Sequence, residues 1–289
     1  MGEGIAASGT LSEKAMQRTL AALQICAHRL EDQGAGKVRC VATEVCRRAR
    51  NAAAFVDRVR QATGLSLEII SAEEEGRLTF AGCADLLQPK DGHALVFDIG
   101  GGSTEILWVR LARDGDRRVE EAISFPFGVV TLAEKYGGVS ISPAHYDEMV
   151  GEIADRLAPF DAAHGIGKAI GKAIAAEEWQ MLGASGTTTT LAGVAMGLAR
   201  YDRSRVDGAY LARAQIAELS SRLRAMPLAE REAHPCIGRG RADLVIQGAA
   251  ILEAIWKTWP VPRLRVADRG IREGILRDLM QAPDPKAQP

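Results

Sequence analysis

Asp98-Ile-Gly-Gly-Gly-Ser-Thr-Glu105 lies between two apolar runs of the chain, Ala94-Leu-Val-Phe97 and Ile106-Leu-Trp-Val109. Apolar runs on both sides of a short glycine turn predict a β-hairpin. Glycine permits a positive φ, and without a Cβ it lets backbone N–H groups converge on an anion. We therefore expect this turn to bind a phosphoryl oxygen.

The same turn carries two carboxylates and a hydroxyl, from Asp98, Glu105 and Ser103. Such hard oxygen ligands suit Mg²⁺ or an attacking water. A dinucleotide fingerprint would need glycines between a strand and a helix, and a Walker loop would need a lysine, so both are disfavoured. An ordinary tight hairpin turn would explain the glycines but not the acid on each flank.

A second candidate anion site follows the expected strand Trp179–Ala184. There the chain continues as Ser185-Gly-Thr-Thr-Thr-Thr190 into an expected helix. The unpaired N–H groups and the dipole at a helix N-terminus favour an anion. Ser185, Gly186 and Thr187 are thus candidate phosphate ligands, although a plain helix cap explains them equally well.

Strand and helix patterns alternate along the rest of the chain. Thr10-x-x-Glu13 is a capping-box pattern ahead of an amphipathic helix. The patterns predict strands at 37–43, 65–71 and 263–267, and helices at 44–63, 72–87, 143–160, 241–255 and 271–280. This alternation, with hairpins mixed in, predicts an α/β fold.

Length and composition indicate two domains. The chain has 289 residues, of which 47% are hydrophobic, enough for a substantial core. Gln88-Pro-Lys-Asp-Gly92 is a polar turn segment, and we place the boundary there. We expect a first domain at 1–90, a second at 91–281 and a flexible tail at 282–289, where proline is frequent.

Charge and cysteine usage exclude several classes of protein. The net charge of −1 gives no general attraction to nucleic acid or to a membrane surface, and we expect neither partner. The five cysteines form no Cys-x-x-Cys pair, which argues against zinc and against a disulfide framework. No apolar run reaches 18 residues and no leader is visible, so a cytoplasmic protein is expected.

Several motifs, in this order, resemble those of the exopolyphosphatase / guanosine pentaphosphate phosphohydrolase family. They are Gly9-Thr-Leu-Ser12, Val41-Ala-Thr-Glu-Val-Cys-Arg47, Ile69-Ile-Ser-Ala-Glu-Glu-Glu-Gly-Arg77, Phe97-Asp-Ile-Gly-Gly-Gly-Ser-Thr-Glu105, Gly128-Val-Val-Thr-Leu132, Gly183-Ala-Ser-Gly-Thr187, Arg241-Ala-Asp243 and Ala267-Asp-Arg-Gly-Ile-Arg-Glu-Gly274. Several motifs in order are far more specific than any one of them. The resemblance implies the actin-like, ribonuclease-H-like fold, with two lobes and an active site between them.

The resemblance also implies a reaction and its residues. It implies Mg²⁺-dependent release of orthophosphate from inorganic polyphosphate or guanosine pentaphosphate, and the sequence does not decide between these substrates. Glu75 would be the general base, and Asp98 and Glu105 would hold the metal, with Glu105 also orienting the attacking water. Arg47 would clamp a phosphate, and the turn would bind phosphoryl oxygens through Gly100, Gly101, Gly102, Ser103 and Thr104. Arginine, amides, Mg²⁺ and a carboxylate suffice for phosphoryl transfer. Whether the chain acts as a homodimer is left open.

One departure from the family concerns the start of the chain. Family members normally open with a strand and a first phosphate turn, Asp-x-Gly-Ser/Thr-Asn, whereas here Met1–Gly9 leads directly into a later segment. We therefore expect a first lobe that lacks its opening strands. Either translation starts upstream of Met1 or activity is impaired, and the intact downstream motifs favour the first reading.

Three other functions are weighed against hydrolysis. A catalytically impaired sensor would bind polyphosphate or a guanosine nucleotide without releasing phosphate. An ATP-using kinase or chaperone-like ATPase of the same fold would need an adenine pocket. A purely structural protein would leave the acid-flanked glycine turn unexplained.

Overall fold

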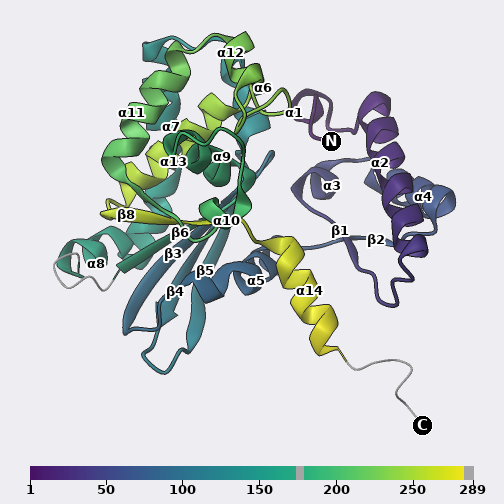
Figure 1. Cartoon of the computed structure of the whole chain (residues 1–289), viewed down its shortest axis with the longest axis horizontal. Helices are drawn as coiled ribbons and strands as arrows, with labels where there is room; N and C mark the ends of the chain where they lie inside the picture. The colour runs from purple at the N-terminus through teal and green to yellow at the C-terminus, as the bar shows by residue number, and fades with distance from the viewer. Residues whose placement is uncertain (174–178, 283–289) are drawn as a thin grey trace. The chain divides into compact units, whose positions relative to one another are not determined.

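The structure is a computed structural model that describes residues 1–173 and 179–282 of the chain, apart from the side chains of residues 6, 7, 172 and 173. The chain forms two compact units (Figure 1). The first joins Met1–Gly82 to the segment that begins at Ile271, and the second is Cys83–Gly270. The expected tail at 282–289 lies, except for Ala282, outside the described residues.

The second unit is built on a six-stranded sheet. Its strands are β3 (Gly92–Ile99), β4 (Thr104–Leu111), β5 (Arg117–Phe125), β6 (Trp179–Ala184), β7 (Tyr210–Ala212) and β8 (Arg263–Ala267), in the order β5-β4-β3-β6-β8-β7. β3 to β5 form antiparallel hairpins, β6 and β8 extend the sheet in parallel with β3, and β7 closes the far edge antiparallel to β8. The hairpin expected around the glycine turn is therefore confirmed, and β6 and β8 have the expected bounds.

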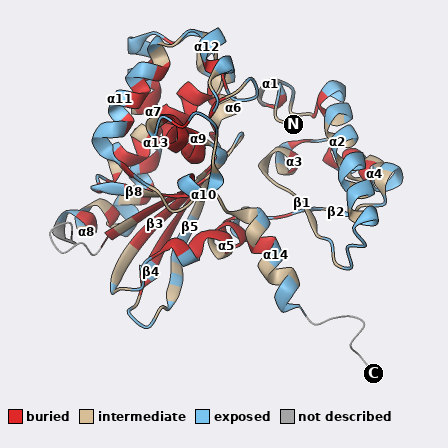
Figure 2. Cartoon of the chain, viewed as in Figure 1, coloured by how far each residue is buried: buried red, intermediate tan, exposed pale blue. Residues whose placement is uncertain are grey.

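Helices cover this sheet and supply its core. α13 (Val245–Thr258) packs against α7 (Pro143–His164), α9 (Gly186–Ala195) and α11 (Arg213–Ala225). Nearly every residue of α13 is buried, and Figure 2 shows it with α9 as a buried block. A helix that is apolar on all sides belongs in the middle of a core. The other helices here are α6 (Val129–Tyr136), α8 (Ile166–Ala173), α10 (Arg203–Val206), α12 (Leu228–Ala233) and the 3₁₀ turn η1 (Ala84–Leu86).

The first unit is smaller. Its two parallel strands, β1 (Cys40–Ala42) and β2 (Leu67–Ile69), are accompanied by α1 (Ile5–Ser8), α2 (Glu13–Asp32), α3 (Glu44–Arg48), α4 (Ala52–Thr63), α5 (Ala72–Cys83) and α14 (Ile271–Gln281). Phe55 and Val59 of α4 are buried with Leu11 in one cluster. Ile70, Leu78 and Ile275 form a second cluster.

α14 belongs to the first unit although the chain reaches it only after the second. A Cβ on Gly274 would lie 1.9 Å from the carbonyl oxygen of Leu78, so α14 and α5 are in direct backbone contact. Arg77 also pairs with Asp278. This division differs from the expected domains 1–90 and 91–281, because the chain enters the second unit at Cys83 and leaves it at Gly270.

Two local predictions were wrong. The helix expected at 44–63 is interrupted between α3 and α4, because the Asn51 side chain hydrogen-bonds the backbone of Leu11 (2.8 and 3.0 Å) and the N–H of Arg50 donates to Gly9. Thr10 does not cap α2. Ser12 does, and its hydroxyl accepts from the N–H of Ala15 at 3.2 Å.

Within residues 1–173 and 179–282, no helix has the length and apolarity needed to cross a membrane.

Candidate active site

The glycine turn between β3 and β4 is held by the start of α6. The carbonyl oxygens of Gly100 and Gly101 accept from the N–H groups of Val129 and Val130, at 3.0 and 2.9 Å. In a trans peptide the N–H points opposite to the C=O. The N–H groups of Gly101 and Gly102 are therefore turned away from α6, and they have no acceptor among the described residues. They are the donors that an anion could use.

Close packing, and not a positive φ, explains Gly100 in this turn and Gly128 at the start of α6. Neither Gly100 nor Gly101 has a φ in the left-handed region, so that part of the prediction was wrong. A Cβ on Gly100 would lie 3.0 Å from the carbonyl oxygen of Ser103. A Cβ on Gly128 would lie 2.5 Å from the carbonyl oxygen of Gly100, so only glycine allows α6 to begin against the turn.

Asp98 and Glu105 are direct cross-strand partners on β3 and β4. Side chains of such a pair leave the same face, with Cβ atoms about 5 Å apart. Glu105 is 3% exposed, and its Oε1 accepts a hydrogen bond from Ser124 at 2.8 Å. Thr104 is fully buried, and its hydroxyl donates to the carbonyl of Phe127, so it stabilises the hairpin.

The carboxylate pair fits Mg²⁺ better than a metal that needs a complete protein cage. Magnesium is commonly held by one or two carboxylates together with substrate phosphates and water. Two adjacent carboxylates beside a turn whose N–H groups have no acceptor among the described residues match such a donor set. Across the described parts of the chain, no cluster of three or more His, Cys, Asp or Glu side chains could hold a metal ion.

The loop after β6 leads into the N-terminus of α9. Ser185 caps this helix, its hydroxyl accepting from the N–H of Thr188 at 3.0 Å. The N–H groups of Gly186 and Thr187 precede the first intrahelical bond and have no acceptor in the described chain. The helix cap at Ser185 is therefore confirmed, and a phosphate contact at Gly186 and Thr187, whose N–H groups are available to an anion, stays a prediction.

The two loops border one cavity. Asp98 on β3 is level with Ala184 on β6, so both strands end at the same edge of the sheet. The cavity between their loops has a volume of about 240 Å³, and Gly100, Gly101, Gly186 and Thr187 are part of its wall. These four predicted phosphate ligands are thus brought together, whereas the described wall does not include Gly102, Ser103, Thr104, Asp98, Glu105 or Ser185.

Arg241 also lines this cavity, and sequence reasoning gave it no role. Its guanidinium donates to the carbonyl of Gly186 at 2.9 Å and to the hydroxyl of Thr190 at 2.5 Å. A Cβ on Gly186 would lie 2.6 Å from the same guanidinium. The motif Arg241-Ala-Asp243 was the available signal, but only the fold brings a residue 55 positions away to the start of α9.

The end of β8 lies near the same helix. Asp268 accepts a hydrogen bond from the hydroxyl of Tyr201 at 2.7 Å. Burial and the Asp268 carboxylate raise the pKa of Tyr201 to about 12, although hydrogen bonding with Thr189 and the charge of Arg241 oppose the shift. Tyr201 therefore stays protonated at neutral pH.

Arg47 and Glu75 belong to the first unit. Arg47 donates to Oε2 of Glu75 at 2.9 Å, to the carbonyl of Ile70 at 2.9 Å and to the carboxylate of Glu44 at 3.0 Å. Only 13% of the Glu75 side chain is exposed. Burial raises the pKa of Glu75 above its usual value, and Arg47 opposes but does not cancel that shift.

Comparison with known proteins identifies the relatives of this chain. The model of the Ppx/GppA phosphatase family matches residues 1–282. The guanosine-5'-triphosphate,3'-diphosphate pyrophosphatase of Pseudoalteromonas atlantica is 27% identical over 273 residues, which cover 94% of this chain and 50% of that protein. Exopolyphosphatase 2 of Mycobacterium tuberculosis is 28% identical over 291 residues, covering 96% of this chain and 86% of that protein. The chain thus spans half the length of the first relative.

A solved structure supports the fold. The Ppx/GppA family member from Aquifex aeolicus superposes with a TM-score of 0.73 at 27% identity, over 96% of this chain and 85% of that one. The expected family and α/β fold are confirmed by these findings.

Proposed function

The chain belongs to the Ppx/GppA phosphatase family, and from this premise we propose that it hydrolyses terminal phosphoanhydride bonds. The proposed substrates are inorganic polyphosphate and guanosine pentaphosphate, and the product is orthophosphate. One observation carries the proposal: the cavity of about 240 Å³ that both glycine-containing loops and Arg241 share. Such a wall offers amides and one guanidinium to a phosphoryl group.

In the proposed site, neutralisation of charge is the main task. A phosphoryl-transfer transition state spreads negative charge over its equatorial oxygens, and fixed donors stabilise it. The N–H groups of Gly186 and Thr187 sit at the positive end of α9, and the N–H groups of Gly101 and Gly102 point away from α6. Arg241 adds a full positive charge. Asp98 and Glu105 would hold Mg²⁺, which supplies charge neutralisation for the phosphate oxygens when bound.

Glu75 is the proposed general base. A carboxylate is a better proton acceptor when its pKa approaches the working pH, and burial moves the pKa of Glu75 in that direction. Arg47 is the proposed positioning residue for Glu75, since it fixes Oε2 through a charge-assisted hydrogen bond of 2.9 Å. A phosphate contact by Arg47 stays a prediction.

The test is orthophosphate release from long-chain polyphosphate and from guanosine pentaphosphate, with Mg²⁺ and with a chelator. We expect release only with the metal. Replacing Arg241 by Gln should lower kcat/KM by roughly ten- to a hundredfold, because one charge-assisted contact to the phosphoryl group is lost.

Arg239→Gln is the matched control, since Arg239 is exposed two positions earlier and does not line the cavity. It should leave kcat/KM unchanged. Absence of release from both substrates would refute hydrolysis, and tight binding without release would favour the sensor alternative. Equal losses in both variants would refute a role for Arg241 at the site.

A further inference from the structure

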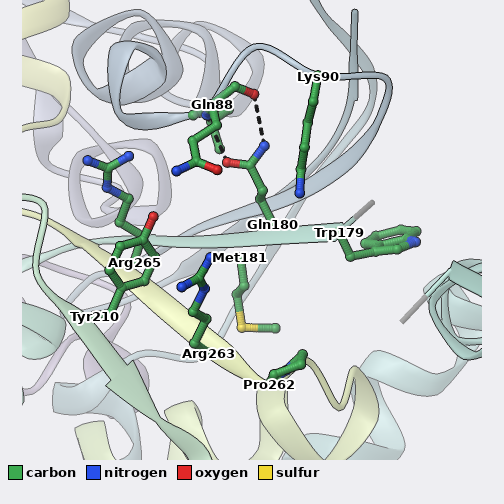
Figure 3. Close-up of a pocket in the computed structure, with 10 residues that line it drawn as sticks. Gln88, Lys90, Trp179, Gln180, Met181, Tyr210, Pro262, Arg263 and Arg265 are labelled. Carbon is green, nitrogen blue, oxygen red and sulfur yellow. Dashed lines mark hydrogen bonds between the residues drawn. The ribbon is translucent and has the colours of Figure 1, made fainter. Parts of the chain in front are cut away.

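A second pocket lies in the second unit, at the edge of the sheet where β3, β6 and β8 begin. Its volume is about 80 Å³, and Lys90, Trp179, Met181, Tyr210, Arg263 and Arg265 are among the residues that line it (Figure 3). The cavity between the glycine loops lies where β3 and β6 end. The six residues of β6 separate the two ends of the sheet by roughly 20 Å. The two pockets are therefore distinct.

The charged residues that line this pocket are all cationic. Lys90, Arg263 and Arg265 contribute three cationic side chains, and no Asp or Glu is among the described residues that line it. Figure 3 shows Lys90 entering from one side and Arg263 from the opposite side. Several cations around one pocket without a carboxylate attract an anion.

Arg263 and Arg265 are arranged around one tyrosine ring. They are two residues apart on β8 and so face the same side of the sheet, and Tyr210 on β7 is the cross-strand partner of Arg265. The guanidinium carbons lie 4.5 Å (Arg263) and 5.4 Å (Arg265) from the centre of the Tyr210 ring. Cation–π contacts of this kind hold the guanidinium groups in place.

The two arginines differ in what their N–H groups do. Arg265 is anchored, because it donates to the carbonyls of Leu86 (2.5 Å) and Gly208 (3.3 Å). The guanidinium of Arg263 makes neither a hydrogen bond nor an ion pair with any described residue, although it is stacked on Tyr210. A planar fork of unused donors, already oriented by stacking, suits a phosphate or carboxylate oxygen pair.

The rest of the wall is fixed. The amide of Gln180 accepts from the N–H of Gln88 at 2.8 Å and donates to its carbonyl at 2.9 Å, as the dashed lines in Figure 3 show. Trp179 stacks on Trp108 with ring centres 4.4 Å apart. A ligand would therefore meet a preformed pocket and would lose little free energy in ordering it.

We propose that this pocket binds one tetrahedral phosphate group, with Arg263 as its principal ligand and Arg265 and Lys90 supplying further positive charge. The pocket has room for a single phosphate group, because its volume of about 80 Å³ is several times the roughly 10–15 Å³ that one water needs by the same measure. The phosphate can be free orthophosphate or the end of a short polyphosphate. Binding here involves no bond cleavage and does not depend on the proposed hydrolysis.

The test is isothermal titration calorimetry of the full chain with orthophosphate and, separately, with tripolyphosphate, in a chelator so that divalent metal is absent. Arg263→Gln should weaken the binding of the anion by about tenfold or more, because a charged donor pair is lost. Arg263→Lys should weaken it less, because it keeps the charge and loses the planar fork. Arg263 is exposed, so neither change should disturb folding.

Two control variants locate the binding. Arg118→Gln removes an exposed strand arginine on β5 that lines no described pocket, and it should bind both anions as the wild type does. Arg241→Gln changes the cavity between the glycine loops, and this variant should retain the anion binding that depends on Arg263.

The proposal is overturned if Arg263→Gln binds both anions as the wild type does, or if Arg118→Gln loses as much affinity. It is overturned too if Arg241→Gln abolishes all binding. The anion that binds more tightly identifies the source of the phosphate. Anion binding that depends on Arg263, in a protein that releases no orthophosphate, would refute the proposed function and leave this site standing.

Discussion

Glu74 and Glu75 are neighbours on α5, and both pair with arginine, yet their protonation equilibria shift in opposite directions. Hydrogen bonds from Arg77 and Arg39 lower the pKa of Glu74 to about 2, with its side chain 27% exposed. Glu75 is 13% exposed, and burial raises its pKa in spite of Arg47. An arginine partner therefore does not fix the charge of a glutamate. The burial of the glutamate decides whether desolvation, which raises its pKa, outweighs the arginine, which lowers it.

The two faces of α5 differ in what they stabilise. The Glu74 face joins α5 to α14 through Arg77 and Asp278, and so contributes to the folding of the first unit. The Glu75 face holds a carboxylate whose ionised form is disfavoured by its surroundings. A perturbed pKa of this kind is typical of catalytic sites. We expect the two positions to separate stability from activity.

The largest effect should come from exchanging the two glutamates for Gln one at a time. Glu75→Gln should lower kcat for orthophosphate release from polyphosphate by about a hundredfold or more, the usual contribution of a general base. Glu74→Gln should leave kcat near the wild-type value. Both rates are measured with Mg²⁺ at pH 7, with circular dichroism to verify the fold. A wild-type rate in Glu75→Gln would remove this residue from the mechanism.

The next effect concerns Arg47, which we propose as a positioning residue. Arg47→Gln should lower kcat by roughly tenfold to a hundredfold and change KM little, because the base is displaced and not removed. Arg47 opposes the raised pKa of Glu75, so its loss should raise that pKa further. The acidic limb of the pH profile of kcat should then move to higher pH.

Arg47→Lys sharpens this test because it keeps the charge and loses the fork that spans Glu75, Ile70 and Glu44. Compared with Arg47→Gln, it should restore part of the rate. It should also return the acidic limb of the pH profile most of the way to its wild-type position. A merely structural role would lower the yield of folded protein in each variant without moving the profile.

The smallest effect should be on stability. Glu74→Gln should lower the free energy of unfolding at pH 7 by about 1 kcal/mol, since a partly exposed ion-pair network is lost. A depressed pKa in the folded state stabilises it above the unfolded value near 4.5, and this contribution is lost as pH falls toward about 2. The difference between wild type and variant in urea unfolding should shrink across that range.

Glu68→Gln is the control for the stability measurement. Glu68 also pairs with Arg39, at 3.0 Å, but 52% of its side chain is exposed, so its loss should cost less. For Glu75 the sign is reversed, because a raised pKa stabilises the folded state below 4.5 and the contribution disappears as pH rises. Glu75→Gln should thus cost little stability at pH 7, and a loss larger than that of Glu74→Gln would contradict the comparison.

Local patterns were enough to predict the parts of the fold that depend on neighbouring residues. The hairpin around Gly100 and the strand that ends at Ala184 follow from alternation and from turn chemistry within a few positions. The interruption between α3 and α4 does not, because Asn51 finds its partner Leu11 40 positions away. Tertiary contacts of this kind override helix propensity.

The candidate site shows the same limit. Its glycines and carboxylates could be found because each motif is contiguous. Arg241 could not be assigned a role, since its contact with Gly186 is created only by the packing of α13 and α9. The ion pair of Arg47 with Glu75 could not be predicted either, because the two residues are 28 positions apart in the chain.

The return of α14 to the first unit has a consequence for synthesis on the ribosome. Every residue of the second unit emerges from the exit tunnel before Ile271, so that unit can acquire its native packing while translation continues. Leu78 and Ile70 must wait for Ile275, which is made about two hundred residues later, and their apolar surface stays uncovered in the nascent chain until then. Slowing elongation across the codons for α14 would lengthen the interval in which chaperones and proteases meet this surface.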